Sequence, residues 1–298
     1  MAQAREIKKR IRSVQSTKKI TRTMELVATS KMKKAQDRVY ASRPYASKMR
    51  DILATMSQAG GGDIDHPLLR VPETSKNTAV FMITSNRGLC GAYNSNVIRL
   101  VLRFLAEEQE AGRRTSLHVS GKKAANVFKW RGTQVDKAYS DPSDMPRYDH
   151  AEEIGGGFID GFSSGAIDKV VIAYTRFVSA GRLEPTIETL LPLQPDALEG
   201  AAKDEDAKGG ARPDYLFEPS AEEIVGTLLP LMVKMRFYEV LLNAQASEHS
   251  ARMVAMKTAT DNAGELISSL ERVYNRERQA QITQELAEIL GGVEALKG

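Results

Sequence analysis

The chain has 298 residues, 42% of them apolar, and a formal net charge of +4. This length allows one or two domains, and the apolar content is that of a globular protein rather than a disordered one. The sequence has no run of about 18 uncharged apolar residues that could span a membrane, and its start lacks the apolar core of a signal peptide. The single cysteine, Cys90, excludes an internal disulfide, and the four histidines lie far apart. We therefore expect no metal and no cofactor.

The charge is distributed unevenly along the chain. Residues 1–50 carry 15 Lys and Arg against 3 Asp and Glu, a net +12, whereas the remainder is net −8. A segment this basic favours an acidic partner, which is either a phosphate backbone or a carboxylate-rich protein.

Residues 1–60 are predicted to form one long helix. No Gly or Pro occurs between Ala2 and Arg43, and apolar residues recur in steps of three and four, which marks one helical face. The steps average slightly above 3.5, which favours weak supercoiling rather than a regular zipper. Pro44 is a candidate kink, and the glycines at 60–62 end the helix. The predicted apolar stripe is Ile7, Ile11, Val14, Ile20, Met24, Ala28, Met32, Ala35 and Val39.

Residues 77–193 are predicted to form an α/β domain. Short apolar runs typical of strands alternate with amphipathic helices, and this alternation indicates a mostly parallel, Rossmann-like βαβ sheet with helices packed on it. The predicted strands are 78–84, 116–120, 169–174 and 186–191, and the predicted helices are 94–111, 122–131 and a weak, Gly-broken one near 150–163.

Residues 194–218 are charged and rich in Gly and Ala, so we expect a mobile loop there. Residues 219–298 are predicted to form a second long helix, because Ser220 and Glu223 have the spacing of a capping box. Pro230 predicts a local kink, and the Ala-rich stretch 244–262, which is poor in large apolar residues, predicts either close packing or a thin section of the rod. The predicted stripe is Leu228, Met232, Met235, Leu242, Leu266, Leu270, Val273, Ile282, Leu286, Ile289, Val293 and Leu296.

The two long helices bury their stripes most simply against each other, as an antiparallel coiled coil. Both join the α/β domain at the same end. With about 56 and about 76 residues at about 1.5 Å each, the second helix extends roughly 30 Å beyond the first. Residues from about 275 onward are then expected to lack an intramolecular partner, and an unpaired apolar helix predicts a socket in another protein.

Two other functions compete with a socket-binding rod. The loop from Asn86 to Asn94 lies between a strand and a helix, where nucleotide folds hold phosphate, but it lacks both the G-x-G-x-x-G and the P-loop spacing. Gly88 and Gly91 are better explained by a tight turn, and Asn94 by an N-cap. No nucleophile–base set is visible, so we predict a non-catalytic protein. The basic first helix also fits a nucleic-acid-binding protein with an α/β insert, although Tyr40 and Tyr45 are its only aromatic residues.

Four sequence blocks together resemble the gamma subunit of bacterial F-type ATP synthases. The most specific is ITQELAEILGG at residues 282–292; the others are residues 18–32, 86–91 and 251–262. They occur in the family's order and cover essentially the whole chain. Val293 departs from the family pattern, which usually has Ala there.

The resemblance implies a rotor subunit, present in one copy per complex, whose paired helices form the central stalk inside a hexamer of alpha and beta subunits. Proton flow through the membrane c-ring would turn it, on the cytoplasmic face of the inner membrane. The resemblance also implies contacts to partner subunits and none to nucleic acid. Those to the hexamer are Lys19, Arg22, Met24, Arg278, Gln279, Thr283 and Glu285; those to the ring and the epsilon subunit are Tyr215, Phe217 and Glu218.

Overall fold

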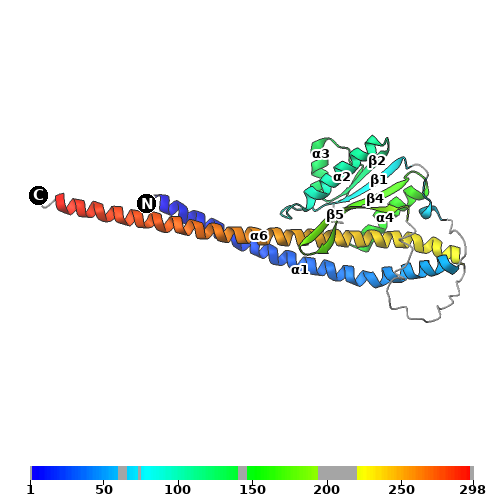
Figure 1. The fold of residues 1–298 in the computed structure, drawn as a ribbon, viewed down its shortest axis with the longest axis horizontal. Helices are drawn as coiled ribbons and strands as arrows, with labels where there is room; N and C mark the ends of the chain where they lie inside the picture. Colours follow the sequence, from blue (N-terminus) through cyan, green and yellow to red (C-terminus); the bar gives the residue numbers. More distant parts are fainter. Residues whose placement is uncertain (1, 60–65, 73–74, 140–145, 194–219, 296–298) are drawn as a thin grey trace. The chain divides into compact units, whose positions relative to one another are not determined.

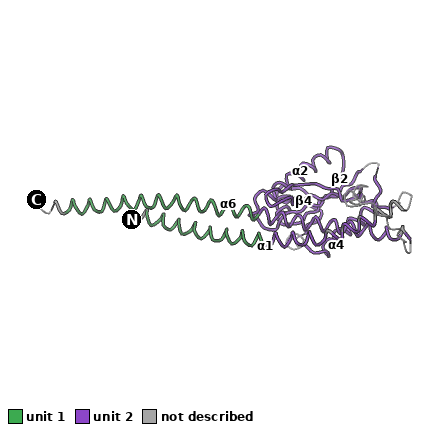
Figure 2. Tube along the Cα trace, turned by 60° about the horizontal axis from the view of Figure 1, so that its bottom comes forward, with its two compact units in different colours: residues 1–29, 252–298 green, residues 30–251 purple. Residues whose placement is uncertain are grey.

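The computed structural model describes residues 2–59, 66–72, 75–139, 146–193 and 220–295. Two long helices, α1 (Ala2–Ala59) and α6 (Ala221–Ala295), enclose the remaining elements in the sequence. The contacts divide the chain into two compact units, coloured separately in Figure 2. Unit 1 consists of residues 1–29 and 252–298, and unit 2 of residues 30–251, so each unit contains part of both long helices.

Unit 2 is built on a five-stranded sheet with the strand order β3-β2-β1-β4-β5 (Figure 1). The strands β1 to β4 pair in parallel, and β5 is antiparallel to β4, which confirms the mostly parallel sheet. Their bounds are β1 (Asn77–Ile83), β2 (Arg114–Ser120), β3 (Lys137–Tyr139), β4 (Lys169–Ser179) and β5 (Arg182–Leu191). The sequence did not predict β3, because its three residues are too few to show a strand pattern.

The shorter helices lie close to their predicted positions. They are α2 (Tyr93–Glu110), α3 (Lys122–Arg131) and α4 (Tyr148–Ser163), with a 3₁₀ turn η1 (Pro67–Leu69). The helix α4 is continuous across its three consecutive glycines rather than broken by them. Tertiary packing explains this continuity, because Phe158, Ile159 and Phe162 are buried and hold the helix in place.

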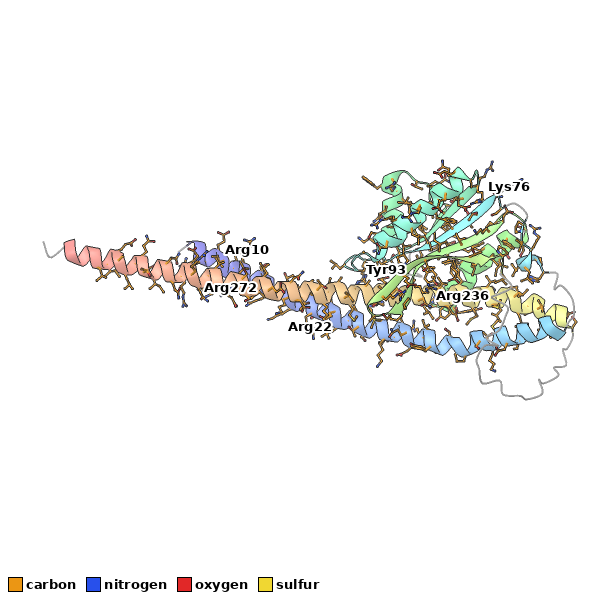
Figure 3. All side chains as sticks on the ribbon, in the orientation of Figure 1. Arg10, Arg22, Lys76, Tyr93, Arg236 and Arg272 are labelled. Atoms are coloured by element: carbon orange, nitrogen blue, oxygen red, sulfur yellow. The ribbon has the colours of Figure 1, made fainter. Side chains whose placement is uncertain are left out.

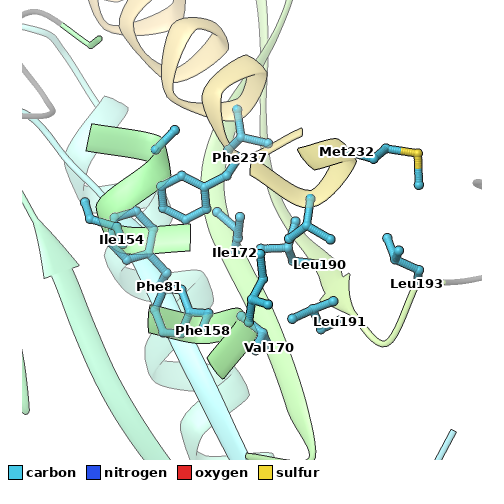
Figure 4. Close-up of a cluster of buried hydrophobic side chains, with 14 of the residues drawn as sticks. Phe81, Ile154, Phe158, Val170, Ile172, Leu190, Leu191, Leu193, Met232 and Phe237 are labelled. Atoms are coloured by element: carbon cyan, nitrogen blue, oxygen red, sulfur yellow. The ribbon is translucent and has the colours of Figure 1, made fainter. Parts of the chain in front are cut away.

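The alternation of side chains along β1 divides the core of unit 2 into two clusters. On one face of the sheet, Val80 and Met82 pack with Val97 of α2 and Phe128 of α3. On the other face, Phe81 packs with Phe158 of α4 and Phe237 of α6, as Figure 4 shows. The ring centroids of Phe81 and Phe237 are 4.9 Å apart. The part of α6 that belongs to unit 2 is therefore a core element of the α/β fold.

Polar contacts also connect this part of α6 to the sheet. The guanidinium of Arg236 donates to Glu188 Oε1 from Nε at 2.8 Å and from Nη2 at 2.5 Å. The Tyr174 hydroxyl donates to the other oxygen of Glu188 at 3.0 Å. Burial, together with the negative charge of Glu188, raises the pKa of Tyr174, so its hydroxyl keeps the proton that it donates. The three side chains thus form a satisfied network between α6, β4 and β5.

The start and middle of α6 agree with the sequence. The Ser220 hydroxyl accepts the Glu223 amide proton at 3.2 Å, which is the predicted capping contact. Within the Ala-rich stretch 244–262, residues 244–250 are all buried, whereas most of residues 251–262 are half-buried or exposed, so close packing holds only for the first part. There the Tyr93 hydroxyl donates to the Ala244 carbonyl and the Ser250 hydroxyl to the Ala180 carbonyl. Both Pro44 and Pro230 lie inside helices that continue past them.

Candidate functional site

Unit 1 is a pair of antiparallel helices, formed by the first half of the N-terminal helix and the last half of α6 (Figure 2). On α6 one row of covered positions recurs in alternating steps of three and four. It consists of Met253, Met256, Thr260, Ala263, Ile267, Leu270, Tyr274, Glu277 and Gln281, and positions beside it, Val273 among them, are half-buried as well. This row has the 3.5-residue period that is typical of coiled coils.

Two predicted stripe residues do not belong to this seam. Ile20 is 58% exposed, and its neighbour Thr21 takes the covered position instead. Leu266 is likewise exposed, with Ile267 in its place. The Thr260 hydroxyl donates to the Thr21 hydroxyl at 2.8 Å, so one layer of the seam is polar. These errors arise because several apolar residues of α1 face solvent, and periodicity alone does not say which of two neighbouring stripes is buried.

Every residue of α6 from Ile282 to Gly292 is exposed. Its large apolar side chains are open to solvent: Ile282 is 47%, Leu286 55%, Ile289 63% and Leu290 68% exposed. Within one helical face they alternate with four of the predicted contact residues, Arg278, Gln279, Thr283 and Glu285, which are also exposed. We call residues 282–292 the tip.

The tip begins later than the sequence analysis predicted. The helices have 58 and 75 residues, a smaller difference than the one assumed. The first helix also starts to pack almost at its N-terminus, since Ala4 and Ile11 are buried. Tyr274, Glu277 and Gln281 are accordingly half-buried, and the uninterrupted run of exposed residues starts at Ile282 instead of about 275.

Residues 18–27 of the first helix, which we call the basic segment, offer a second exposed surface in unit 1. Lys19 and Arg22 are exposed, and Arg22 forms an ion pair with Glu25 at 2.8 Å. Met24 is half-buried at the edge of the seam. Three large apolar residues that the sequence analysis had not assigned to a surface, Ile20, Leu26 and Val27, are exposed here. Figure 3 shows the position of Arg22 beside other side chains of unit 1, including Arg10 and Arg272.

The predicted foot residues Tyr215, Phe217 and Glu218 lie outside the described residues. In the part of the chain that the structure covers, no group of three or more His, Cys, Asp or Glu residues could hold a metal ion. No helix among the described residues is long and apolar enough to cross a membrane.

The loop from Asn86 to Asn94, which lies between β1 and α2, is held by hydrogen bonds among its own residues and to the end of β1. Leu89 and Gly91 have positive φ angles of 62° and 55°, so the turn predicted at Gly91 is confirmed, whereas the other left-handed position is Leu89 and not the predicted Gly88. Asn94 is not the N-cap of α2, since that position is Ala92. Its amide group instead accepts the Ser85 amide proton at 2.9 Å and donates to Cys90 Sγ at 3.2 Å. Asn94 therefore ties the loop to the end of β1.

The N-terminus of the neighbouring α3 is also occupied by protein groups. Its first amides donate to Asn86 Oδ1 at 3.0 Å, to the Ser85 carbonyl at 3.2 Å and to Thr84 Oγ1 at 3.1 Å. A bound phosphate would need these same amides. The local geometry thus favours a structural role for the loop over a nucleotide site.

A mostly parallel α/β unit and a pair of antiparallel helices make up a fold that also occurs in solved rotor and central-stalk structures. The rotor of the Euglena gracilis mitochondrial ATP synthase is similar with a TM-score of 0.63 at 20% identity, covering 94% of this chain and 99% of that one. The central stalk and c-ring structure from Tetrahymena thermophila gives a TM-score of 0.58 at 24% identity, covering 80% of this chain and 99% of that chain. At these identities the likeness shows the fold alone.

Sequence comparison identifies the family. A family model described as ATP synthase matches residues 3–296. The ATP synthase gamma chain of Leptospira biflexa is 42% identical over 296 residues, covering 99% of this chain and 100% of the relative. The gamma chain of Gemmatimonas aurantiaca is 42% identical over 298 residues, covering both chains completely. The chain belongs to the ATP synthase gamma chain family, and the predicted family and fold class are confirmed.

Proposed function

We propose that this chain is the central-stalk rotor subunit of an F-type ATP synthase. It would couple proton flow through the membrane ring to ATP synthesis and hydrolysis on the beta subunits, without catalytic residues of its own. The observation that carries this proposal is the tip, which continues a paired coiled coil as a single helix with exposed Ile282, Leu286 and Ile289. A shaft whose free end sits in a socket has this construction, because the exposed apolar surface needs a cover.

The partners follow from the same proposal. The hexamer of alpha and beta subunits would hold the tip, and the epsilon subunit and c-ring would meet the foot. Arg278, Gln279, Thr283 and Glu285 would make the polar contacts of the tip, and their exposure in the structure supports this role. Lys19, Arg22 and Met24 would face acidic hexamer segments, and Tyr215, Phe217 and Glu218 would form the foot. The complex would lie on the cytoplasmic face of a bacterial inner membrane.

Family membership argues against the nucleic-acid-binding alternative. The basic charge of the first 50 residues favours an acidic partner. A carboxylate-rich hexamer is as complementary to this charge as a phosphate backbone is. Copurification with an ATP-hydrolysing alpha–beta hexamer, rather than salt-dependent binding to duplex DNA, distinguishes the two.

Removal of the tip tests the proposal directly. A chain that ends at Gln281 keeps every half-buried seam residue of unit 1 but loses the exposed helix. We expect proton-driven ATP synthesis in membrane vesicles to fall several-fold, because the shaft end no longer has its socket contacts. A chain that lacks only residues 293–298 serves as the control and should remain coupled. Full coupling in the Gln281-terminated chain, with its helical content intact by circular dichroism, would show that the tip is dispensable.

The basic segment is tested by charge neutralisation. Changing Lys18, Lys19 and Arg22 together to Gln is expected to weaken assembly or coupling, and the defect should change with ionic strength because exposed charges act through screened attraction. The matched control neutralises Lys31, Lys33 and Lys34, which are exposed on the same helix but belong to unit 2. ATP synthesis is measured across a salt series. Equal coupling of the two triple variants at every salt concentration would contradict a specific role of this segment.

A further inference from the structure

The only tryptophan of the chain lies on the surface of unit 2. Trp130, in the last turn of α3, is 85% exposed, more than any other large apolar side chain that the structure describes. The fold does not need it, because Ala124 and Phe128 already supply the buried face of α3. An indole presents about 150–250 Å² of surface and is enriched at protein interfaces, so an exposed tryptophan that the core does not use is a candidate anchor for a partner.

The surroundings of Trp130 are strongly basic. The sequence of α3, from Lys122 to Arg131, contains four cationic residues and no Asp or Glu. All four, Lys122, Lys123, Lys129 and Arg131, are exposed. Among the described residues none of them forms an ion pair within 4.0 Å. Since intramolecular carboxylates do not neutralise these charges, the surface is complementary to an acidic one.

The chemistry of this surface favours a protein over a lipid bilayer or a nucleic acid. A helix that binds a bilayer inserts a whole apolar face, whereas the apolar face of α3 is buried in unit 2 and only one large apolar side chain points outward. Single-stranded nucleic acid is bound by several stacking aromatics, and α3 exposes one. A single exposed indole on a helix whose charged residues are all cationic fits a single pocket, and Trp and Arg are the residues that most often dominate protein interfaces.

We propose that α3 is a docking surface for an acidic region of a partner protein, with the indole of Trp130 inserted into an apolar pocket of that partner. Lys129 and Arg131, which precede and follow Trp130 in the sequence, pair with the partner's carboxylates. This surface belongs to unit 2 and includes none of the tip or basic-segment residues, so it stands independently of the rotor function.

Hydroxyl-radical footprinting of Trp130 tests the proposal, because the chain has no second tryptophan to confuse the signal. The oxidation rate of Trp130 is measured by mass spectrometry in the purified chain, in membrane vesicles from cells that produce the full chain, and in the same vesicles after detergent has removed the lipid. We expect the oxidation rate to be about fivefold lower in the vesicles and in the detergent-treated sample than in the purified chain. The reason is that residues in the core of an interface lose nearly all their accessible area.

Charge-reversal variants provide the matched comparison. Lys129→Glu with Arg131→Glu should return Trp130 in vesicles to the oxidation rate of the purified chain. Arg99→Glu with Arg103→Glu, which changes two exposed arginines of α2 by the same total charge, should leave the protection intact. A zero-length carboxylate–amine cross-linker should then join Lys129 to an Asp or Glu of one partner protein.

Three results would overturn the proposal. Equal oxidation of Trp130 in the purified chain and in vesicles would mean that nothing covers it. Protection that disappears with the lipid would assign the surface to the membrane. Protection of Trp130 that survives the charge reversal of Lys129 and Arg131 would show that no acidic region of a partner covers it.

Discussion

Replacing Gly121 with Ala is expected to unfold unit 2. Gly121 lies between β2 and α3 with a φ angle of 97°, and a Cβ at this position would lie 2.1 Å from the carbonyl oxygen of Thr84 and 2.6 Å from its carbon. Both atoms belong to the backbone that follows β1, so neither moves without breaking the sheet. We expect the free energy of unfolding to fall by more than about 4 kcal/mol, a loss reserved for the most disruptive substitutions.

Gly132→Ala is the matched control for this effect. Gly132 also has a positive φ, 70°, but a Cβ there meets no atom within 4 Å. Its cost should therefore be limited to about 1–2 kcal/mol, the penalty of the left-handed conformation itself. Urea unfolding followed by circular dichroism, with hydrogen exchange of the β1 amides, compares the two variants. Similar stabilities would show that the contact with Thr84 is not the reason for the glycine.

Replacing Phe237 with Ala should produce the second-largest loss of stability. The Phe237 side chain is completely buried, and its ring packs against those of Phe81 and Phe158 at centroid distances of 4.9 and 6.4 Å. Its removal leaves a cavity between α6, β1 and α4, and substitutions of this kind cost about 3–5 kcal/mol. Because Phe237 belongs to the core, we expect the midpoint of urea unfolding of the α/β unit to fall.

Phe237→Leu separates the cavity from the loss of aromatic contact. Leucine fills more of the same space, so it should cost less than alanine. The midpoints of urea unfolding of both variants are compared with that of the original chain. If Phe237→Ala unfolds at the original midpoint, then α6 is not an integral part of the core of unit 2.

The sequence predicted most elements because their local signals agree with the fold. The helix 122–131 was predicted with the bounds that the structure shows, since Gly121 and Gly132 delimit it and Phe128 supplies its apolar face. The capping contact of Ser220 was likewise readable from spacing. The strand β3 was not predicted because Lys137–Tyr139 is held by its pairing with β2, and no local sequence pattern indicates this pairing.

The errors in the candidate site have one physical origin. Ile20 was assigned to the seam and is exposed, whereas Thr21 is covered, because the choice of face depends on the partner helix. Asn94 was assigned as an N-cap but binds Ser85 and Cys90, because the loop folds back on the end of β1. Both residues have ordinary local preferences that tertiary contacts overrode.

What the sequence determined by itself is the set of elements and the inequality of the two long helices, since helix propensity, periodicity and length are local properties. The motif at residues 282–292 also identified the family without any coordinates. Only the tertiary structure decided which residues the seam covers and where the tip begins, at Ile282 rather than about 275. The same holds for the exposure of Trp130. The burial of a side chain depends on the surface that packs against it. Local sequence patterns describe one surface of a helix but do not show which other surface covers it.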